Sequence, residues 1–375
     1  MTFDTQLTLE ILPTRELPAF STSGASWRAY LNQISLEAFL AWVKAEQNPS
    51  ARVATQLAAL PSFWEFVNGC VIAIQDIRLV LIPTTAIDTA ELRVPQEWLD
   101  IPDWIADYYI AIQVNSNAGW VSIYGYTTHR QLKTKGVYDA SDRTYSLDTD
   151  DLIKDINGLW ITRQLCPTEI LRESVAPLPN LPLTQAQNLL QRLRHSEIVF
   201  PRLAIPWEIW GAFIAHGGWR QQLYEHRQGT LQQWSIPQWL QSGVSNLAQQ
   251  FGWNLTLLQL APRGVRSREV EESGGLTRQL TLAGNFYELR VFPIGDLADN
   301  TWRFELRNAN PQQIIPAGFK LRLLTEDLQP FANNEDTAQE VIAQLYVDVV
   351  MEPGEGIVWE VEPTPEGYER EILQF

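Results

Sequence analysis

The strongest constraint on the fold is a two-residue alternation of apolar and polar side chains in residues 266–375. Tyr287, Leu289 and Val291 alternate with charged residues, and the same pattern recurs over residues 302–307. Side chains of a strand alternate between two faces, so this pattern predicts half-buried antiparallel strands. Further apolar runs separated by proline and glycine bring the number of strands to about seven, which favours an immunoglobulin-like or jelly-roll β-sandwich.

The middle of the chain, residues 176–265, follows a helical period instead. Thr184 is a good N-cap, and apolar residues follow from Ala186 at offsets 0, 3, 4 and 7. Further helices are expected to open at Pro206 and Pro237, because proline suits the first helical position. This segment holds 6 basic and 3 acidic residues, so we expect it to dock on an acidic segment or partner.

The N-terminal part combines both periods. Ser35 is predicted as the N-cap of a helix, with apolar residues from Leu36 at offsets 0, 3, 4 and 7. From Cys70 to about Tyr145 the period is two, which predicts a small antiparallel sheet or partly closed barrel. The chain is therefore expected to be α+β. It is expected to have three domains: an α+β domain at 1–175, a helical segment at 176–265 and a β-sandwich at 266–375.

Charge and hydropathy limit the classes of partner that the chain is expected to bind. The chain has 28 Lys and Arg against 44 Asp and Glu, a net charge of −16 and a pI near 4.7. This balance argues against binding to nucleic acid or to an anionic membrane surface. The mean hydropathy is −0.16, and the most apolar stretch, 71–83, is interrupted by charged and polar residues, so no membrane span is expected.

Cysteine usage and the first residues indicate a compartment. Cys70 and Cys166 are the two cysteines, and neither lies in a CxxC or histidine-rich pattern. This predicts neither a disulfide framework nor a zinc site. The N-terminus lacks a basic segment followed by an apolar run, so no secretory signal is expected. We therefore expect a cytoplasmic protein.

Tryptophan is abundant, with 15 in the chain. Trp207 and Trp210 fall on the apolar side of a predicted helix and are expected in the core. Trp219 and Trp234 fall on no apolar stripe. We take Trp219 and Trp234 as candidate binding residues, since an exposed indole stacks on sugars and other planar ligands.

One basic stretch interrupts the acidic N-terminal half. Its candidate binding residues are Arg130, Lys133, Lys135 and Arg143. Four cations in so short a stretch predict a contact with an anion or an acidic peptide.

A histidine next to that stretch suggests an alternative function, that of a hydrolase. His129 precedes Ser141 and the acids Asp139 and Asp142, which are the residue types of a hydrolytic triad. No glycine elbow surrounds Ser141, so no catalytic residue is assigned and a hydrolase centred on His129 stays the alternative.

The remaining motifs point to no cofactor. The chain contains neither a phosphate-binding loop nor a dinucleotide fingerprint. The acids at 148–155 lack the spacing of a calcium loop and precede an apolar helical run, so helix N-capping explains them and no metal is expected.

Two passages resemble a known family. They run from Gly125 through Tyr138 to Leu152, and from Pro353 through Trp359 to Phe375. They are similar to an uncharacterised family that is widespread in cyanobacteria and is known as a domain of unknown function. The resemblance spans nearly the whole chain and implies no activity, cofactor or site residue.

These observations favour a non-enzymatic interaction or regulatory protein that binds another protein. No set of nucleophile, base and oxyanion donors can be assembled from the motifs. A small-molecule or glycan-binding module that uses exposed tryptophans and the hydrolase centred on His129 remain the alternatives. The sequence sets no oligomeric state.

Overall fold

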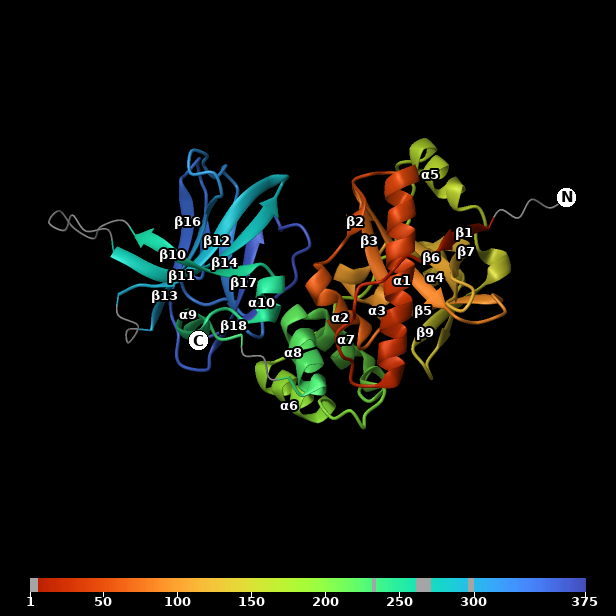
Figure 1. Ribbon diagram of the computed structural model, residues 1–375, viewed down its shortest axis with the longest axis horizontal. Coiled ribbons are helices and arrows are strands. Elements are labelled where there is room, and N and C mark those ends of the chain that lie inside the picture. The colour runs from red at the N-terminus through yellow and green to blue at the C-terminus, as the bar shows by residue number, and fades with distance from the viewer. Residues whose placement is uncertain (1–5, 231–233, 261–270, 296–299) are drawn as a thin grey trace. The chain divides into compact units, whose positions relative to one another are not determined.

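The computed structural model describes residues 6–230, 234–260, 271–295 and 300–375 (Figure 1). For residues 258–260 and 271–273 it describes the backbone alone. The chain divides into two compact units, Met1–Thr230 and Leu231–Phe375. Helices and antiparallel strands occur in both units, so the predicted α+β class is confirmed.

The first unit contains most of the helices. Its α-helices are α1 (Ser23–Glu46), α2 (Leu60–Trp64), α3 (Glu97–Asp100), α4 (His129–Lys135), α5 (Ile156–Leu165), α6 (Leu183–Leu193), α7 (Trp207–Ala215) and α8 (Gly217–Gln228). Short 3-10 turns are η1 (Leu57–Ala59), η2 (Pro102–Trp104), η3 (Thr149–Asp151) and η4 (Pro201–Leu203). Its strands are β1 (Leu7–Glu10), β2 (Arg52–Val53), β3 (Cys70–Ile74), β4 (Ile77–Thr84), β5 (Glu91–Pro95), β6 (Tyr108–Asn115), β7 (Trp120–Thr128), β8 (Val137–Asp139) and β9 (Thr144–Asp148).

A six-stranded sheet forms the centre of this unit, in the order β1-β7-β6-β4-β3-β2. Consecutive residues such as Val80, Leu81 and Ile82 are all buried, so both faces of β4 are covered. Strands β4 and β6 pair in parallel, whereas the other pairs are antiparallel. The alternation in the sequence does not predict this parallel pair, because a strand's own pattern says nothing of its neighbour's direction.

Helix α1 lies against the central sheet and begins earlier than predicted. Thr22 is its N-cap, and the Thr22 side chain accepts a hydrogen bond from the backbone N–H of Ala25. Ser35, which the sequence suggested as the N-cap, is fully buried inside the helix. Buried residues occur on all sides of the central part of α1, as expected for a helix covered on every side.

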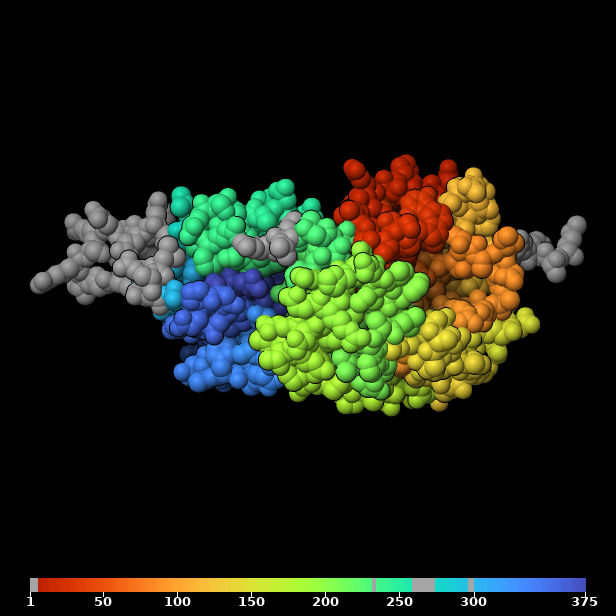
Figure 2. Space-filling model, turned by 90° about the horizontal axis from the view of Figure 1, so that it is seen from below, coloured from red at the N-terminus to blue at the C-terminus, as the bar shows by residue number. Residues whose placement is uncertain are grey.

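Helices α6, α7 and α8 belong to the first unit, and Figure 2 shows the yellow-green to green stretch that contains them gathered at its surface. The predicted helical segment 176–265 is thus divided between the two units. The three-domain division stays a prediction about which parts fold independently.

The second unit opens with two short helices, α9 (Ile236–Ser242) and α10 (Asn246–Gln250). The helix expected to open at Pro237 is therefore divided in two. Gly243 separates the two, because its backbone φ of 92° does not fit a right-handed helix.

The strands described for this unit form two sheets. A five-stranded sheet has the order β10-β11-β12-β13-β16, and a four-stranded sheet has the order β15-β14-β17-β18. The strands are β10 (Trp253–Leu260), β11 (Glu271–Leu282), β12 (Asn285–Pro293), β13 (Thr301–Asn308), β14 (Lys320–Thr325), β15 (Glu335–Thr337), β16 (Gln344–Val350), β17 (Gly356–Glu362) and β18 (Ile372–Gln374). All described pairings within both sheets are antiparallel.

Aromatic side chains join the two sheets of the second unit. The ring centroids of Tyr287 and Phe319 are 5.2 Å apart, and those of Trp302 and Phe375 are 5.0 Å apart. Strands β11 and β12 are joined by a hairpin turn at Ala283 and Gly284, with positive φ at both residues, as a two-residue hairpin turn requires.

Candidate functional site

The candidate site lies on a small three-stranded sheet of the first unit, in the order β5-β9-β8, beside α4. Thr128 is the N-cap of helix α4, and its side chain accepts a hydrogen bond from the backbone N–H of Gln131. One turn later, Lys133 extends its ammonium to two groups. Its Nζ lies 2.7 Å from Asp100 Oδ1 and 2.7 Å from the hydroxyl of Tyr145.

The electrostatics of this trio fix its charge state. Burial opposes the charged ammonium, but the hydrogen bonds to Asp100 and Tyr145 raise the pKa of Lys133. Burial also raises the pKa of Tyr145. At neutral pH the lysine is therefore a cation and the tyrosine is neutral, so neither is a ready proton acceptor.

The trio supports a second tyrosine at the edge of the sheet. The ring centroid of Tyr138 on β8 lies 4.9 Å from that of Tyr145. The Tyr138 hydroxyl donates to Gln96 Oε1 at 2.8 Å, and the Gln96 amide donates to Asp100 at 2.9 Å. Tyr138 is 41% exposed, and its neighbour Val137 is 69% exposed. A fixed aromatic side chain thus stands at an open sheet edge.

The other three predicted basic residues are engaged within the chain. Arg130 forms an ion pair with Glu173 at 3.0 Å, and Lys135 forms one with Asp151 at 3.2 Å. Arg143 donates to the backbone carbonyls of Arg202 and Ile205 (2.5 Å for the latter). Carboxylates offset much of the positive charge of this stretch. The predicted contact with an anion or acidic peptide therefore has weaker support than the residue types alone suggest.

His129 is enclosed at the start of α4 and is fully buried. Its Nε2 lies 2.9 Å from the carbonyl oxygen of Leu99, and its Nδ1 accepts from the backbone N–H of Glu173 at 3.0 Å. The carbonyl requires the proton on Nε2, so both ring nitrogens are occupied. Burial lowers the pKa of His129.

The acids proposed as partners of His129 are engaged elsewhere. The Ser141 hydroxyl donates to Asp139 at 2.7 Å. The Thr144 hydroxyl and backbone N–H both donate to Asp142. The hydrolase reading therefore finds no support in the contacts of His129, Ser141, Asp139 or Asp142.

The structure places both candidate ligand-stacking tryptophans among other rings. Trp219 is 3% exposed, and its ring centroid lies 4.2 Å from that of His216. Trp234, in the second unit, is 8% exposed and packs edge-on against Phe251 at 5.2 Å. A ligand could stack on either indole only after this packing opened.

Sequence reasoning missed two buried ion pairs of the first unit. Glu97 accepts two hydrogen bonds from Arg202, at 2.7 and 2.9 Å, and a third from Trp210 at 2.8 Å. Glu65 pairs with Arg227 on α8. A signal was available for Glu65, because it is a single charge within the apolar run 63–67.

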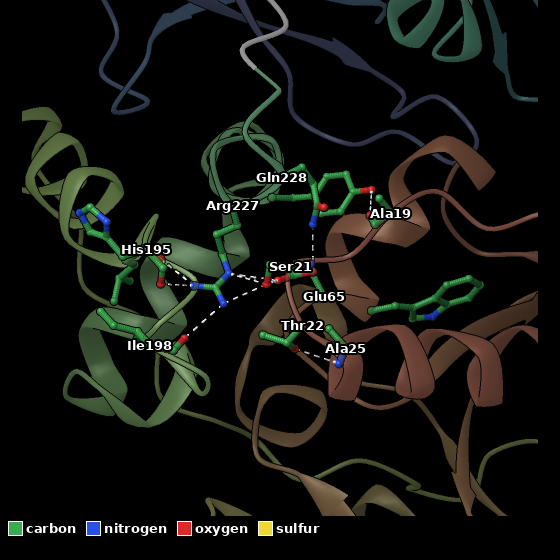
Figure 3. A network of polar contacts seen from close by, with 12 residues as sticks. Ala19, Ser21, Thr22, Ala25, Glu65, His195, Ile198, Arg227 and Gln228 are labelled. Carbon is green, nitrogen blue, oxygen red and sulfur yellow. Dashed lines mark hydrogen bonds and ion pairs between the residues drawn. The ribbon is translucent and has the colours of Figure 1, made fainter.

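The Glu65 pair is the centre of the polar network in Figure 3. Arg227 also donates to the hydroxyl of Ser21 and to the backbone carbonyls of Leu193, His195 and Ile198. One guanidinium thus joins the segment before α1, the loop after α6, and α8, which makes this network a structural tie.

The capping expectation for the acidic cluster is confirmed. The Asp148 side chain accepts from the backbone N–H of Asp150 at η3, and the Asp155 side chain accepts from Asn157 at α5. Within the described ranges, no group of three or more His, Cys, Asp and Glu side chains is placed to hold a metal ion. The same part of the chain includes no helix long and apolar enough to cross a membrane.

The fold and site define an α+β protein with a helix-covered mixed sheet in one unit and a two-sheet antiparallel assembly in the other. The chain belongs to the family described as "Protein of unknown function (DUF1822)", whose family model matches residues 14–374. This confirms the resemblance to a domain of unknown function. Comparisons with curated proteins and with solved structures each found no match.

One residue of the first resembling passage has a clear structural reason. A Cβ atom on Gly125 of β7 would lie 2.8 Å from the Cβ of Leu152. The segment that carries Leu152 and Ile153 packs directly on the strand, and Ile153 and Tyr126 exchange backbone hydrogen bonds of 2.9 Å. Only a residue without a side chain permits this close approach.

Proposed function

We propose that this protein is a non-enzymatic, cytoplasmic interaction protein that binds another protein through the edge of the small sheet. We call this edge the β8 surface and define it by Lys135, Val137 and Tyr138. The observation that carries the proposal is Tyr138, which is 41% exposed although its hydroxyl and one side of its ring are held by neighbouring groups.

An immobilised tyrosine suits protein binding for an energetic reason. Association orders side chains at a cost of about 0.5–1.5 kcal/mol for each flexible one, and a side chain that is already fixed avoids much of this cost. Tyrosine is also among the residues that most often dominate the binding energy of interfaces. The Lys133, Asp100 and Tyr145 trio therefore supports the proposal indirectly, by holding the ring on which Tyr138 packs.

The composition of the β8 surface matches that of an interface. Val137 provides apolar area, and Lys135 contributes a charged group whose side chain is 57% exposed. An apolar centre with a polar rim is the usual arrangement of a non-obligate interface. β8 lies at the edge of its sheet, so a partner that covers this edge contacts Val137 on one face and Tyr138 on the other.

The non-enzymatic part of the proposal rests on the chemistry of the same region. The pKa of Lys133 is raised, the pKa of Tyr145 is raised, and both nitrogens of His129 are engaged. None of these groups is poised near neutral pH to take a proton from a substrate.

The test is affinity capture from the soluble extract of the producing cells, followed by mass identification at low and high salt. The wild-type protein is compared with Tyr138→Ala and with the control Tyr346→Ala, which removes a tyrosine of similar exposure, 44%, from the second unit. We expect a partner that Tyr138→Ala loses and Tyr346→Ala retains. Equal capture by all three proteins, or capture by none, would overturn the proposal.

A further inference from the structure

Two consecutive buried residues, Gln96 and Glu97, connect the β8 surface to a part of the first unit that is distant in sequence. The side-chain carbonyl of Gln96 accepts from the hydroxyl of Tyr138 at 2.8 Å. The carboxylate of Glu97 is bound by Arg202 through both Nε and Nη2, at 2.9 and 2.7 Å. Gln96 is 6% exposed and Glu97 is fully buried. A displacement of Glu97 therefore moves the neighbouring residue that holds Tyr138.

The same arginine also holds the turn between β8 and β9, residues 140–143. Its Nη1 donates to the backbone carbonyl of Asp142, and its Nη2 donates to that of Arg143 at 3.0 Å. All three nitrogens of the Arg202 guanidinium are therefore engaged by Glu97 or by this turn. The guanidinium is a rigid planar fork, so it fixes the turn and Glu97 relative to each other.

Arg143 closes this junction from the side of the turn. Its guanidinium donates to the backbone carbonyls of Arg202 and Ile205. The backbone φ of Arg143 is 53°, in the left-handed region that arginine rarely adopts. Such a conformation persists only where surrounding contacts hold it, and the Arg143 carbonyl accepts from the backbone N–H of Gln96 as well as from Arg202. Loss of these contacts therefore favours release of the turn.

Strand β8 depends on this turn because it is short. It consists of three residues, lies at the edge of its sheet and pairs with β9. One end of β8 follows Gly136, the C-cap of α4, and the other end enters the 140–143 turn. The backbone that carries Tyr138 is thus held at one end by α4 and at the other by the junction with Arg202.

We propose that Arg202 is a positioning residue of the β8 surface, which keeps Tyr138 in its binding orientation by holding Glu97 and the 140–143 turn together. This inference rests on the proposed function, because the orientation of Tyr138 matters for binding only if a partner contacts it. Arg202 itself does not contact the partner. It acts through Gln96 and the turn, so opening of the junction weakens binding at the β8 surface.

Arg202→Lys tests the proposal in the free protein. Lysine keeps a positive charge beside the buried Glu97 but lacks the fork that binds the carboxylate and the turn together. Amide hydrogen exchange, which reports local opening, is followed by mass spectrometry for residues 137–145 and for β4. We expect exchange in 137–145 to be at least tenfold faster in Arg202→Lys than in the wild type. Exchange in β4 is expected to change less than twofold.

Two further variants make this test specific. Arg192 on α6 also donates to a backbone carbonyl near Arg202, that of Ala204 at 3.3 Å, and its described hydrogen bond does not involve the 140–143 turn. We therefore expect Arg192→Lys to exchange like the wild type. Arg143→Met opens the junction from the side of the turn and leaves the ion pair of Glu97 intact. We expect it to accelerate exchange in 137–145 at least tenfold, which tests the junction even if Arg202→Lys does not fold.

The second readout is the affinity for the partner that the wild type captures and Tyr138→Ala loses, purified after its identification. A residue that serves stability alone leaves the dissociation constant unchanged at a temperature at which the variant is fully folded. We expect Arg202→Lys to raise this constant at least tenfold. Combined with Tyr138→Ala, Arg202→Lys is expected to change the constant less than twofold further, because Arg202 acts through Tyr138.

Three results would overturn this inference. The first is unchanged exchange in 137–145 in both Arg202→Lys and Arg143→Met. The second is equal exchange in Arg202→Lys and Arg192→Lys. The third is an unchanged dissociation constant in Arg202→Lys although its turn exchanges faster, because the junction would then not position the binding surface. Equal capture by the wild type and Tyr138→Ala overturns the proposed function instead, and faster exchange would then show only that Arg202 anchors the turn.

Discussion

Arg227 and Glu65 form a buried ion pair, with Arg227 Nε 3.0 Å from Glu65 Oε1 and both side chains 1% exposed. Arg227→Met removes the cation and leaves the carboxylate of Glu65 buried without its partner. Breaking a buried pair in this way costs about 3–5 kcal/mol of stability. We expect urea unfolding to show a loss of this size.

Two further variants show whether the ion pair is the cause. Arg227→Met combined with Glu65→Gln removes both charges, and we expect it to be more stable than Arg227→Met alone. Arg93→Met breaks the surface ion pairs of Arg93 with Glu91, Asp139 and Asp142, in which the arginine side chain is 44% exposed, and we expect a loss of at most about 1 kcal/mol. Equal losses from Arg227→Met and Arg93→Met would contradict this account.

His129 makes the stability of the first unit depend on pH. A second proton on its ring would fall on Nδ1, which already accepts from the N–H of Glu173. Burial lowers the pKa of His129 in the folded state, whereas a histidine in the unfolded chain has a pKa of about 6.5. The unfolded state therefore binds protons first. The contribution of His129 is fully present above about pH 6.5 and is lost as the pH falls below it.

Melting temperatures between pH 8 and pH 5 check this expectation. In His129→Gln, an amide replaces the ring and does not titrate. We expect the variant to be less stable at pH 8 and to lose less stability than the wild type on acidification. Parallel curves for the two proteins would show that His129 contributes nothing to the pH dependence.

Trp219 and Trp27 provide a matched pair for the role of tryptophan in the first unit. Trp219 is 3% exposed, and Trp27 on α1 is 48% exposed. Trp219→Ala leaves a cavity beside His216 and Phe213, so we expect a loss of about 3–5 kcal/mol in urea unfolding. Trp27→Ala is expected to cost much less, because its ring is already half in water. If Trp219→Ala leaves the stability unchanged, the indole does not stabilise the core, and the result favours ligand stacking as its role.

Sequence reasoning was most successful where a local pattern decides the outcome. Strand alternation at Tyr287, Leu289 and Val291 identified β12. The acids at 148–155 were expected to cap helices, and Asp148 and Asp155 do so at η3 and α5. Hydrophobic periodicity, turn chemistry and helix capping depend on residues close together in the chain, so they can be predicted from the sequence.

The candidate site was recognised in part. The basic residues 130–143 lie in the region of the proposed site, but no pattern in the sequence indicates that Lys133 meets Asp100 and Tyr145. Tyr138, which carries the proposed function, was missed because its exposure depends on β8 lying at a sheet edge. Trp219 and Trp234 were chosen because they fall on no apolar stripe. Other rings bury both, His216 and Phe213 beside Trp219 and Trp239 and Phe251 beside Trp234.

The sequence by itself determined the α+β class, the strand-rich C-terminal part, the caps at Asp148 and Asp155, and the acidic balance of the chain. It did not determine the N-caps of α1 and α6, because Ser35 and Thr184 were expected there and the structure has Thr22 and Pro182 at these positions. The tertiary structure alone decided which distant groups meet, as in the parallel pairing of β4 with β6 and the contact of Arg227 with Glu65, 162 residues apart in sequence. The physical reason is the distance along the chain over which each interaction acts. Hydrogen-bonding periodicity and backbone φ preferences act between neighbours, whereas burial and ion pairing depend on the packing of the whole unit.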